Sequence, residues 1–124
     1  MICIDANVLI EIILGRKNAE ICRKYIDSHK EDMATTVLSL DIVMYYAESN
    51  KLSLRPVEHF LRLFTWLAIT DTDAEAAFKY FKDKDFEDAL QISCAVREGC
   101  SRFVTLDRGL AKKYSKEIPI DLLV

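Results

Sequence analysis

The sequence predicts an α/β fold in which helices pack around a parallel sheet. Short apolar runs alternate along the chain with longer stretches of helical period, a pattern typical of strands joined by crossover helices. The chain has 124 residues, of which 51% are hydrophobic, and it contains only three glycines and two prolines. This composition favours an ordered globular protein, and the length favours one domain that spans residues 1–124.

Five of the apolar runs are interpreted as strands, with helices in the gaps between them. The strands are expected at residues 1–4, 33–36, 67–70, 102–105 and 118–122. A helix is expected over residues 18–28, and Pro56 fits the first turn of another, where its missing N–H costs nothing. A further helix is expected over residues 86–98, with Gly99 as its stop signal. Its inner face is predicted to carry Ala89, Ile92, Ser93 and Val96.

Composition and spacing exclude several classes of protein. No window approaches the roughly 20 consecutive apolar residues that span a bilayer, and Asp5 and Glu11 interrupt the apolar N-terminal stretch. We therefore expect a protein without a membrane partner, located in the cytoplasm. The four cysteines form no CxxC pair and the two histidines are isolated, so neither a disulfide framework nor a zinc site is expected.

Charge is unevenly spread along the chain. The formal net charge of −3 argues against a protein that simply coats nucleic acid. Residues 31–90 hold twelve acids and six bases, whereas residues 91–124 hold six bases and four acids. Two interpretations are open for these last bases, a path for phosphate groups or an ordinary solvated face. They are Arg97, Arg102, Arg108, Lys112, Lys113 and Lys116.

Four aspartates occupy related places in this plan. Asp5 ends the first strand, and Asp107 follows the strand at 102–105. Asp41 and Asp88 lie in the early turns of helices. Ligands of an open parallel sheet bind beyond the carboxyl ends of its strands, so these acids are expected to meet at that edge. Taken singly, each acid also fits a helix cap, a turn or a solvated position, but their joint placement favours a common site.

Clustered carboxylates indicate a particular chemistry. They suit hard cations such as Mg²⁺ and Mn²⁺, whereas zinc, iron and copper prefer histidine or thiolate. An ion held by carboxylates lowers the pKa of a bound water and neutralises charge on a phosphate under attack. Neither a Ser/His/Asp nor a Cys/His pairing is evident in the sequence. The residues themselves therefore favour metal-assisted hydrolysis.

In these same segments the chain resembles the PIN domain family, over nearly its whole length. The segment IDANVLIEIILGR is similar to the family's first strand and helix, in which Asp5 is the first metal-binding acid and Asn7 supports it. The segment TTVLSLDIVMYYA is similar to the second block, where Asp41 stands in the place at which most members carry a glutamate. An alternative register assigns this second acid to Glu48.

The third and fourth blocks of the family are matched near the C-terminus. The segment DFEDALQISCAV is close to the third block and assigns its acid to Asp88, with Glu87 as a neighbour that also has a carboxylate to offer. The segment FVTLDRGL resembles the fourth block, with Thr105 as the polar support and Asp107 as the last acid.

The resemblance implies a three-layer α/β/α fold with a mostly parallel sheet, and an endoribonuclease that hydrolyses RNA with Mg²⁺ or Mn²⁺. It also implies a VapC-like toxin held by an antitoxin, as in many small bacterial and archaeal members. Asp5, Asp88 and Asp107 are then the expected direct or water-mediated ligands, and Asp41 binds a second ion or orients the attacking water. A homodimer is a further expectation, because residues 43–46 and 60–66 are rich in apolar and aromatic side chains.

Two other functions are open at this point. A phospho-receiver signalling domain is also built around aspartates, but it needs paired acids after its first strand and a lysine after its last central strand. Here Ala6 follows Asp5, and no lysine follows residues 103–105 at the matching place. The second is a PIN-like domain that has lost catalysis and acts as a binding module, and the complete set of acids speaks against it.

Overall fold

The computed structural model describes residues 1–29, 31–80 and 84–124. The described residues form a five-stranded sheet in the order β3-β2-β1-β4-β5, and each pair of neighbours is parallel. The predicted α/β class and parallel sheet are thus confirmed. The strands are β1 (Ile2–Ile4), β2 (Met33–Thr36), β3 (Thr65–Leu67), β4 (Arg102–Thr105) and β5 (Ile120–Leu122).

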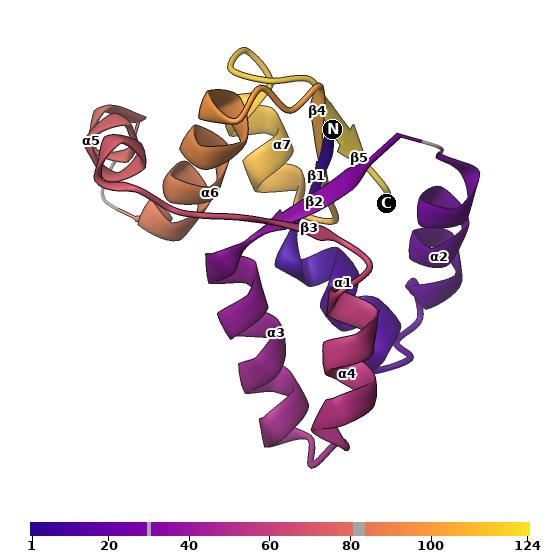
Figure 1. Ribbon diagram of the computed structural model, residues 1–124. Helices are drawn as coiled ribbons and strands as arrows, with labels where there is room; N and C mark the ends of the chain where they lie inside the picture. The colour runs from indigo at the N-terminus through magenta and orange to yellow at the C-terminus, as the bar shows by residue number, and fades with distance from the viewer. Residues whose placement is uncertain (30, 81–83) are drawn as a thin grey trace.

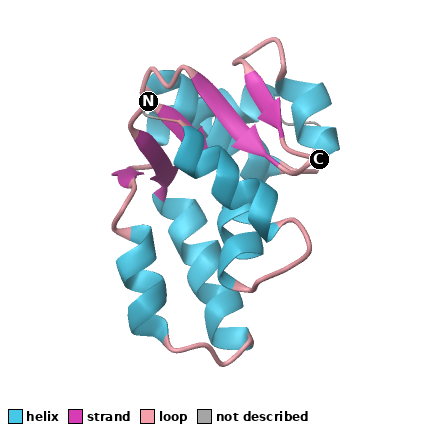
Figure 2. Cartoon of the chain, turned by 90° about the vertical axis from the view of Figure 1, so that its right-hand side faces the viewer, coloured by secondary structure: helices cyan, strands magenta, loops and turns pink. Residues whose placement is uncertain are grey.

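The helices cover the sheet on both faces, which gives three layers (Figure 1). Helices α1 to α4 lie on one side of the sheet and α5 to α7 on the other, and α3 and α4 project together beyond the sheet (Figures 1 and 2). None of the helices in the described ranges is both long and apolar enough to cross a bilayer. The helices are α1 (Ala6–Ile13), α2 (Ala19–Ser28), α3 (Val37–Ser49), α4 (Leu54–Leu61), α5 (Asp71–Tyr80), α6 (Phe86–Arg97) and α7 (Arg108–Tyr114).

The core is divided by the sheet because successive strand residues point to opposite faces. Ile2 and Ile4 of β1 pack in a cluster with residues of α1 to α4, whereas Cys3 between them packs in the cluster on the α6 and α7 side. In the same way, Val104 and Phe103 of β4 belong to different clusters. All three residues of β1 and the two middle residues of β4 are therefore apolar, as a parallel sheet covered on both faces requires.

Some predicted elements are displaced in the structure. Strand β3 ends at Leu67, where the sequence placed the start of a strand over 67–70. The backbone beyond Leu67 bonds to helices instead, because the Ala68 carbonyl accepts from Arg97 Nη2 and the Thr70 N–H donates to Asp73. Strand β5 is shorter at its start than the predicted 118–122. Val96 was predicted to face inward from α6, but it is 45% exposed.

The strand order creates one point at which the chain changes direction across the sheet. From the central β1 the chain builds β2 and β3 on one side, and then returns to build β4 and β5 on the other. The connections to β2 and to β4 therefore run to opposite sides of β1. In open α/β sheets, such a change of direction leaves a crevice beyond the carboxyl ends of the two neighbouring strands, here β1 and β4. The residues that immediately follow these two strands are placed at that crevice.

Candidate active site

Three of the predicted acids are brought to this edge of the sheet. Asp5 follows β1 directly and Asp107 lies just beyond β4. The two strands are neighbours, and their register pairs Ile4 with Val104. Asp88 lies in the first turn of α6. Residues that are about a hundred positions apart in the chain therefore meet at the crevice between β1 and β4.

The three acids differ in exposure, from the floor of the site to its rim. Asp5 is 6% exposed, Asp88 is half-buried and Asp107 is exposed. Burial raises the pKa of Asp5 to about 6, although a hydrogen bond from Thr105 opposes the shift. Burial, together with the charges of Asp5 and Asp107, raises the pKa of Asp88 to about 7. The site is therefore a crowded group of anions whose charge a cation would stabilise.

The hydroxyl of Thr105 organises the floor of the site. It donates its one proton to Asp5 Oδ2 at 2.8 Å, and it accepts from Asn7 Nδ2 at 3.1 Å and from the Asp107 N–H at 3.0 Å. Its donor and both lone pairs are thus in use. Asn7 is fixed at its other end, because Asn7 Oδ1 accepts from the Leu106 N–H at 3.2 Å. The two side chains that the sequence named as supports join β1, α1 and β4 in one hydrogen-bonded unit.

Asp107 is held by the helix that follows it. Asp107 Oδ1 accepts from the Leu110 N–H at 3.1 Å and so caps α7. A Cβ built on Gly109 would lie 3.2 Å from the same oxygen, so glycine leaves room for the carboxylate there. The capping interpretation does not extend to Asp5, whose side chain forms no cap bond to α1. The residue before α6, Asp85, forms no cap bond either.

The fourth predicted acid, Asp41, is on a different helix from Asp88. It is an exposed residue of α3, and the alternative Glu48 lies two helical turns beyond it and is also exposed. Glu87, the neighbour of Asp88, acts more directly on the site. After burial, the charges that most raise the pKa of Asp88 are those of Asp5, Asp107, Asp85 and Glu87. Glu87, which the sequence indicated as a neighbour of Asp88 with a carboxylate to offer, therefore belongs to the interacting group, whereas Asp41 is not among the charges that most raise the pKa of Asp88.

The donor set suits a hard divalent cation. In residues 1–29, 31–80 and 84–124, no three Asp, Glu, His or Cys side chains already converge closely enough to hold one metal ion. The acids that share the site nevertheless offer only oxygen ligands, which Mg²⁺ and Mn²⁺ prefer. Burial and neighbouring carboxylates raise the pKa of Asp5 and of Asp88, and a bound divalent cation would oppose both shifts. The residues therefore fit such an ion.

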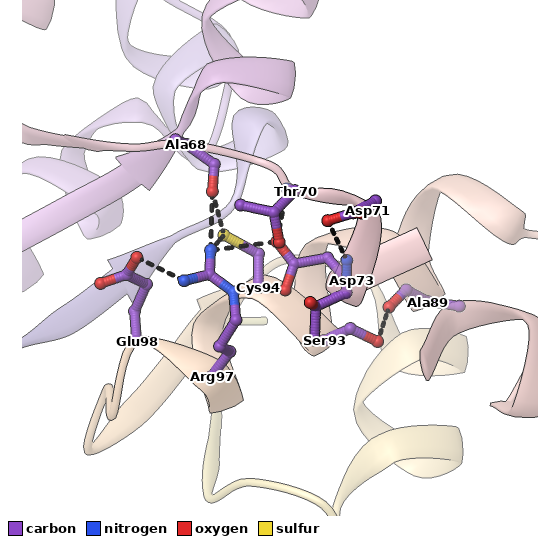
Figure 3. A network of polar contacts seen from close by, with 10 residues as sticks. Ala68, Thr70, Asp71, Asp73, Ala89, Ser93, Cys94, Arg97 and Glu98 are labelled. Carbon is purple, nitrogen blue, oxygen red and sulfur yellow. Dashed lines mark hydrogen bonds and ion pairs between the residues drawn. The ribbon is translucent and has the colours of Figure 1, made fainter. Parts of the chain in front are cut away.

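Two of the six bases considered for a phosphate path are used within the fold. Arg97 donates from Nε to Asp73 Oδ1 at 2.7 Å and from Nη2 to Asp73 Oδ2 at 3.1 Å (Figure 3). Arg102 donates from Nη1 to both carboxylate oxygens of Asp121 at 2.8 Å. The other four of these six bases have no ion pair to a described residue, are exposed, and lie on or just after α7: Arg108, Lys112, Lys113 and Lys116.

Comparisons with known proteins agree with this arrangement. The model of the PIN domain family matches residues 2–116. A toxin–antitoxin complex from Klebsiella pneumoniae is similar with a TM-score of 0.79 at 19% identity, over 100% of this chain and 98% of that chain. VapC20 of Mycobacterium tuberculosis, described as a sarcin-ricin loop cleaving toxin, gives 0.77 at 11% identity, over 90% and 94%. FitAcB from Neisseria gonorrhoeae gives 0.71 at 17% identity, over 99% and 98%. Curated protein sequences gave no match.

Proposed function

The chain belongs to the PIN domain family, and on that premise we propose that it is an endoribonuclease that depends on Mg²⁺ or Mn²⁺. The observation that carries the proposal is the group of Asp5, Asp88 and Asp107 at the crevice between β1 and β4, in which the burial and mutual charge of the acids raise the pKa of two of them. Such a group is costly to a fold unless a cation binds it.

Each residue of the site has a part in this proposal. Asp5, Asp88 and Asp107 would hold the ion, and Asp41, on the exposed side of α3, would serve a second ion or position water. A bound Mg²⁺ or Mn²⁺ would supply a lowered pKa for a coordinated water and a positive charge beside the scissile phosphate. Thr105 keeps one oxygen of Asp5 occupied and so sets the direction of the other. Thr105 and Asn7 are thus positioning residues.

The strand order argues against the receiver domain. A receiver of the flavodoxin-like type has the order 2-1-3-4-5, whereas this sheet has the order 3-2-1-4-5. In this sheet β1 is next to β4, so the neighbour of Asp5 is Thr105 of β4. In the receiver order, the neighbour of the first strand is the third strand instead. A PIN domain without catalysis remains the competing function, and an assay separates the two.

RNA as the substrate is supported by the chemistry next to the acids. The four exposed bases on or just after α7 begin at Arg108, which adjoins Asp107. Lys and Arg side chains that no carboxylate holds are available to phosphate groups, and single-stranded RNA presents such groups without a duplex groove. The description of VapC20 as a sarcin-ricin loop cleaving toxin is consistent with this proposal.

The test is cleavage of a labelled single-stranded RNA by the purified chain. We expect cleavage with Mg²⁺ or Mn²⁺, none in EDTA, and none from Asp5→Asn or Asp88→Asn in a folded variant. Asp27→Asn, which removes an exposed carboxylate on α2, is the matched control and should cleave normally. Undiminished cleavage after thorough removal of metal would refute the proposal, and a folded wild type that never cleaves would support the binding module.

An antitoxin partner is the second part of the proposal. An apolar groove of about 350 Å³ lies between α3 and α4, with Leu40, Met44 and Trp66 on its walls. Trp66 is 40% exposed and Leu63 nearby is 77% exposed, so apolar surface is left for a partner. Growth arrest by the chain, relieved by a small protein encoded beside it and restored by Met44→Glu, would support an antitoxin at this groove.

A homodimer was also expected from the sequence. Light scattering that shows only monomer would count against the homodimer.

A further inference from the structure

A buried polar bridge connects two of the helices that carry the acids. Gln91 of α6 is 1% exposed, and its Oε1 accepts from Ser39 Oγ at 2.7 Å. Thr36 Oγ1 lies 3.5 Å from the same oxygen and also accepts from the Ser39 N–H at 3.0 Å, which caps the start of α3. Thr36 and Ser39 are fully buried. We call Thr36, Ser39 and Gln91 the amide bridge.

The amide bridge crosses from one helical layer to the other. Helix α6 lies on one side of the sheet and α3 leads away on the opposite side (Figure 1). Thr36, the last residue of β2, contacts the same Gln91 oxygen that accepts from Ser39, so the bridge lies at the carboxyl end of β2. Gln91 lies three residues after Asp88 on α6, and Ser39 lies two residues before Asp41 on α3. The bridge therefore connects the helix of the third acid to the helix of the second.

Packing alone does not explain why a polar side chain occupies the position of Gln91. A buried amide must be desolvated, and an apolar side chain of similar size would fill the same space without that cost. What a hydrogen bond adds is direction, because it tolerates only small changes in distance and angle, whereas apolar contacts let helices slide past one another. The bond between Ser39 and Gln91 thus fixes the start of α3 relative to the start of α6.

We infer that Gln91 is a positioning residue for the metal site, which acts through Ser39 to hold the Asp41 helix in register with the Asp88 helix. The inference rests on the proposed function, since it assigns Gln91 to the same site. It gives Asp41 a defined place relative to the other acids, although Asp41 itself is exposed and bonds to none of them. Partners in the shell behind the ligands are known to change metal affinity and turnover by roughly 10-fold to 100-fold.

The variants are chosen to change one member of the amide bridge at a time. Gln91→Met keeps the volume and removes the acceptor, and Ser39→Ala removes the donor while the backbone N–H that caps α3 remains. Ser93→Ala is the matched control, because Ser93 is also buried on α6 and its hydroxyl donates to the Ala89 carbonyl at 2.7 Å within the same helix. It loses a buried hydrogen bond of similar length without touching α3.

The measurements are the Mn²⁺ dissociation constant by calorimetry, and kcat and KM for a labelled RNA. We expect Gln91→Met and Ser39→Ala each to weaken Mn²⁺ binding and to lower kcat by roughly tenfold, with KM for RNA unchanged. The double variant should lose no more than either single one, because both act through one bond. Ser93→Ala should stay within about twofold of wild type in all three quantities, even if its melting temperature falls as far as that of the bridge variants.

The outcomes separate this inference from the proposed function. Bridge variants that lose thermal stability as Ser93→Ala does, yet bind Mn²⁺ and turn over like wild type, would overturn the positioning role and leave the nuclease intact. A wild type that neither binds Mn²⁺ nor cleaves RNA would instead overturn the proposed function, and the inference with it. If Gln91→Met does not fold, Ser39→Ala decides alone.

Discussion

Thr105 Oγ1 donates to Asp5 Oδ2 across 2.8 Å, which joins the ends of β4 and β1 through one hydroxyl. The same hydroxyl accepts from the side chain of Asn7 and the backbone of Asp107. One buried group therefore sets the direction of the first acid and anchors the segment that carries the last. Removal of this hydroxyl should therefore weaken metal binding, beyond any weakening that follows from a less stable fold.

We expect Thr105→Val to weaken Mn²⁺ binding by roughly tenfold and to destabilise the fold by about 1 to 3 kcal/mol, because Asn7 and Asp107 lose their acceptor. Thr35→Val is the control, since Thr35 is equally buried and its hydroxyl donates to the Ile4 carbonyl at 2.9 Å without touching a carboxylate. Calorimetry and thermal melting measure the two effects. Equal losses of Mn²⁺ affinity in both variants would contradict the role given to Thr105.

Gly109→Ala tests the space around Asp107. The new methyl would lie 3.2 Å from Asp107 Oδ1 and should push the carboxylate aside. Alanine also favours the helix over glycine by up to roughly 1 kcal/mol, so stability should be nearly unchanged while metal affinity falls. The measurement is Mn²⁺ binding beside a melting curve. Asp107→Asn combined with Gly109→Ala should bind no worse than Asp107→Asn alone, and additive losses would show that the methyl acts elsewhere.

The raised pKa of Asp88 makes a prediction about stability without metal. A group whose pKa is higher in the folded state stabilises the fold below its unfolded pKa, about 3.9 for Asp, and loses that contribution as pH rises through the folded pKa of about 7. In EDTA at pH 7.5, Asp88→Asn should therefore melt a few degrees above wild type, which corresponds to roughly 1 kcal/mol after allowance for solvent screening.

Added Mg²⁺ should reverse this order. An ion at about a hundred times its dissociation constant stabilises the intact site by roughly 2.7 kcal/mol, and Asp88→Asn should lose most of that gain. Asp27→Asn, which lies outside the site, should melt like wild type in both conditions. A wild type whose melting temperature does not respond to Mg²⁺ would argue against a metal site.

The pair of Asp73 and Arg97 predicts the opposite dependence on pH. Burial alone would raise the pKa of Asp73, but hydrogen bonds from Arg97 and the Thr70 N–H lower it below its usual range. Asp73 therefore stabilises the fold above its pKa in the unfolded chain, and this stabilisation is lost as pH falls through its lower pKa in the folded protein. Arg97→Met should cost roughly 2 kcal/mol at pH 7, and the difference from wild type should shrink below about pH 4.

Urea unfolding at both pH values measures this difference. Arg55→Met is the control, because Arg55 pairs with Glu58 on an exposed surface and such pairs contribute little. A loss in Arg97→Met that persists unchanged in acid would point to packing of the side chain rather than to its charge.

Local patterns in the sequence were sufficient for most elements and for the places of Asp5, Asp88 and Asp107 in the fold. The run at 102–105 is a strand as predicted, because a segment of this length bounded by turn residues is too short for a helix and suits a buried strand. The helix at 86–98 was predicted to within one residue, since its period and its stop signal Gly99 are local features of the sequence. Asp5, Asp88 and Asp107 could be named because each follows directly from the end of a strand or the start of a helix.

The tertiary structure alone decided which of these groups meet. Nothing local states that β1 pairs with β4 about a hundred residues away, and only that pairing brings Thr105 to Asp5. Likewise, Arg97 and Arg102 appeared free in the sequence but are held by Asp73 and Asp121. Periodicity and capping depend on neighbours within a turn or two, whereas strand pairing and ion pairs depend on how the whole chain closes its long loops.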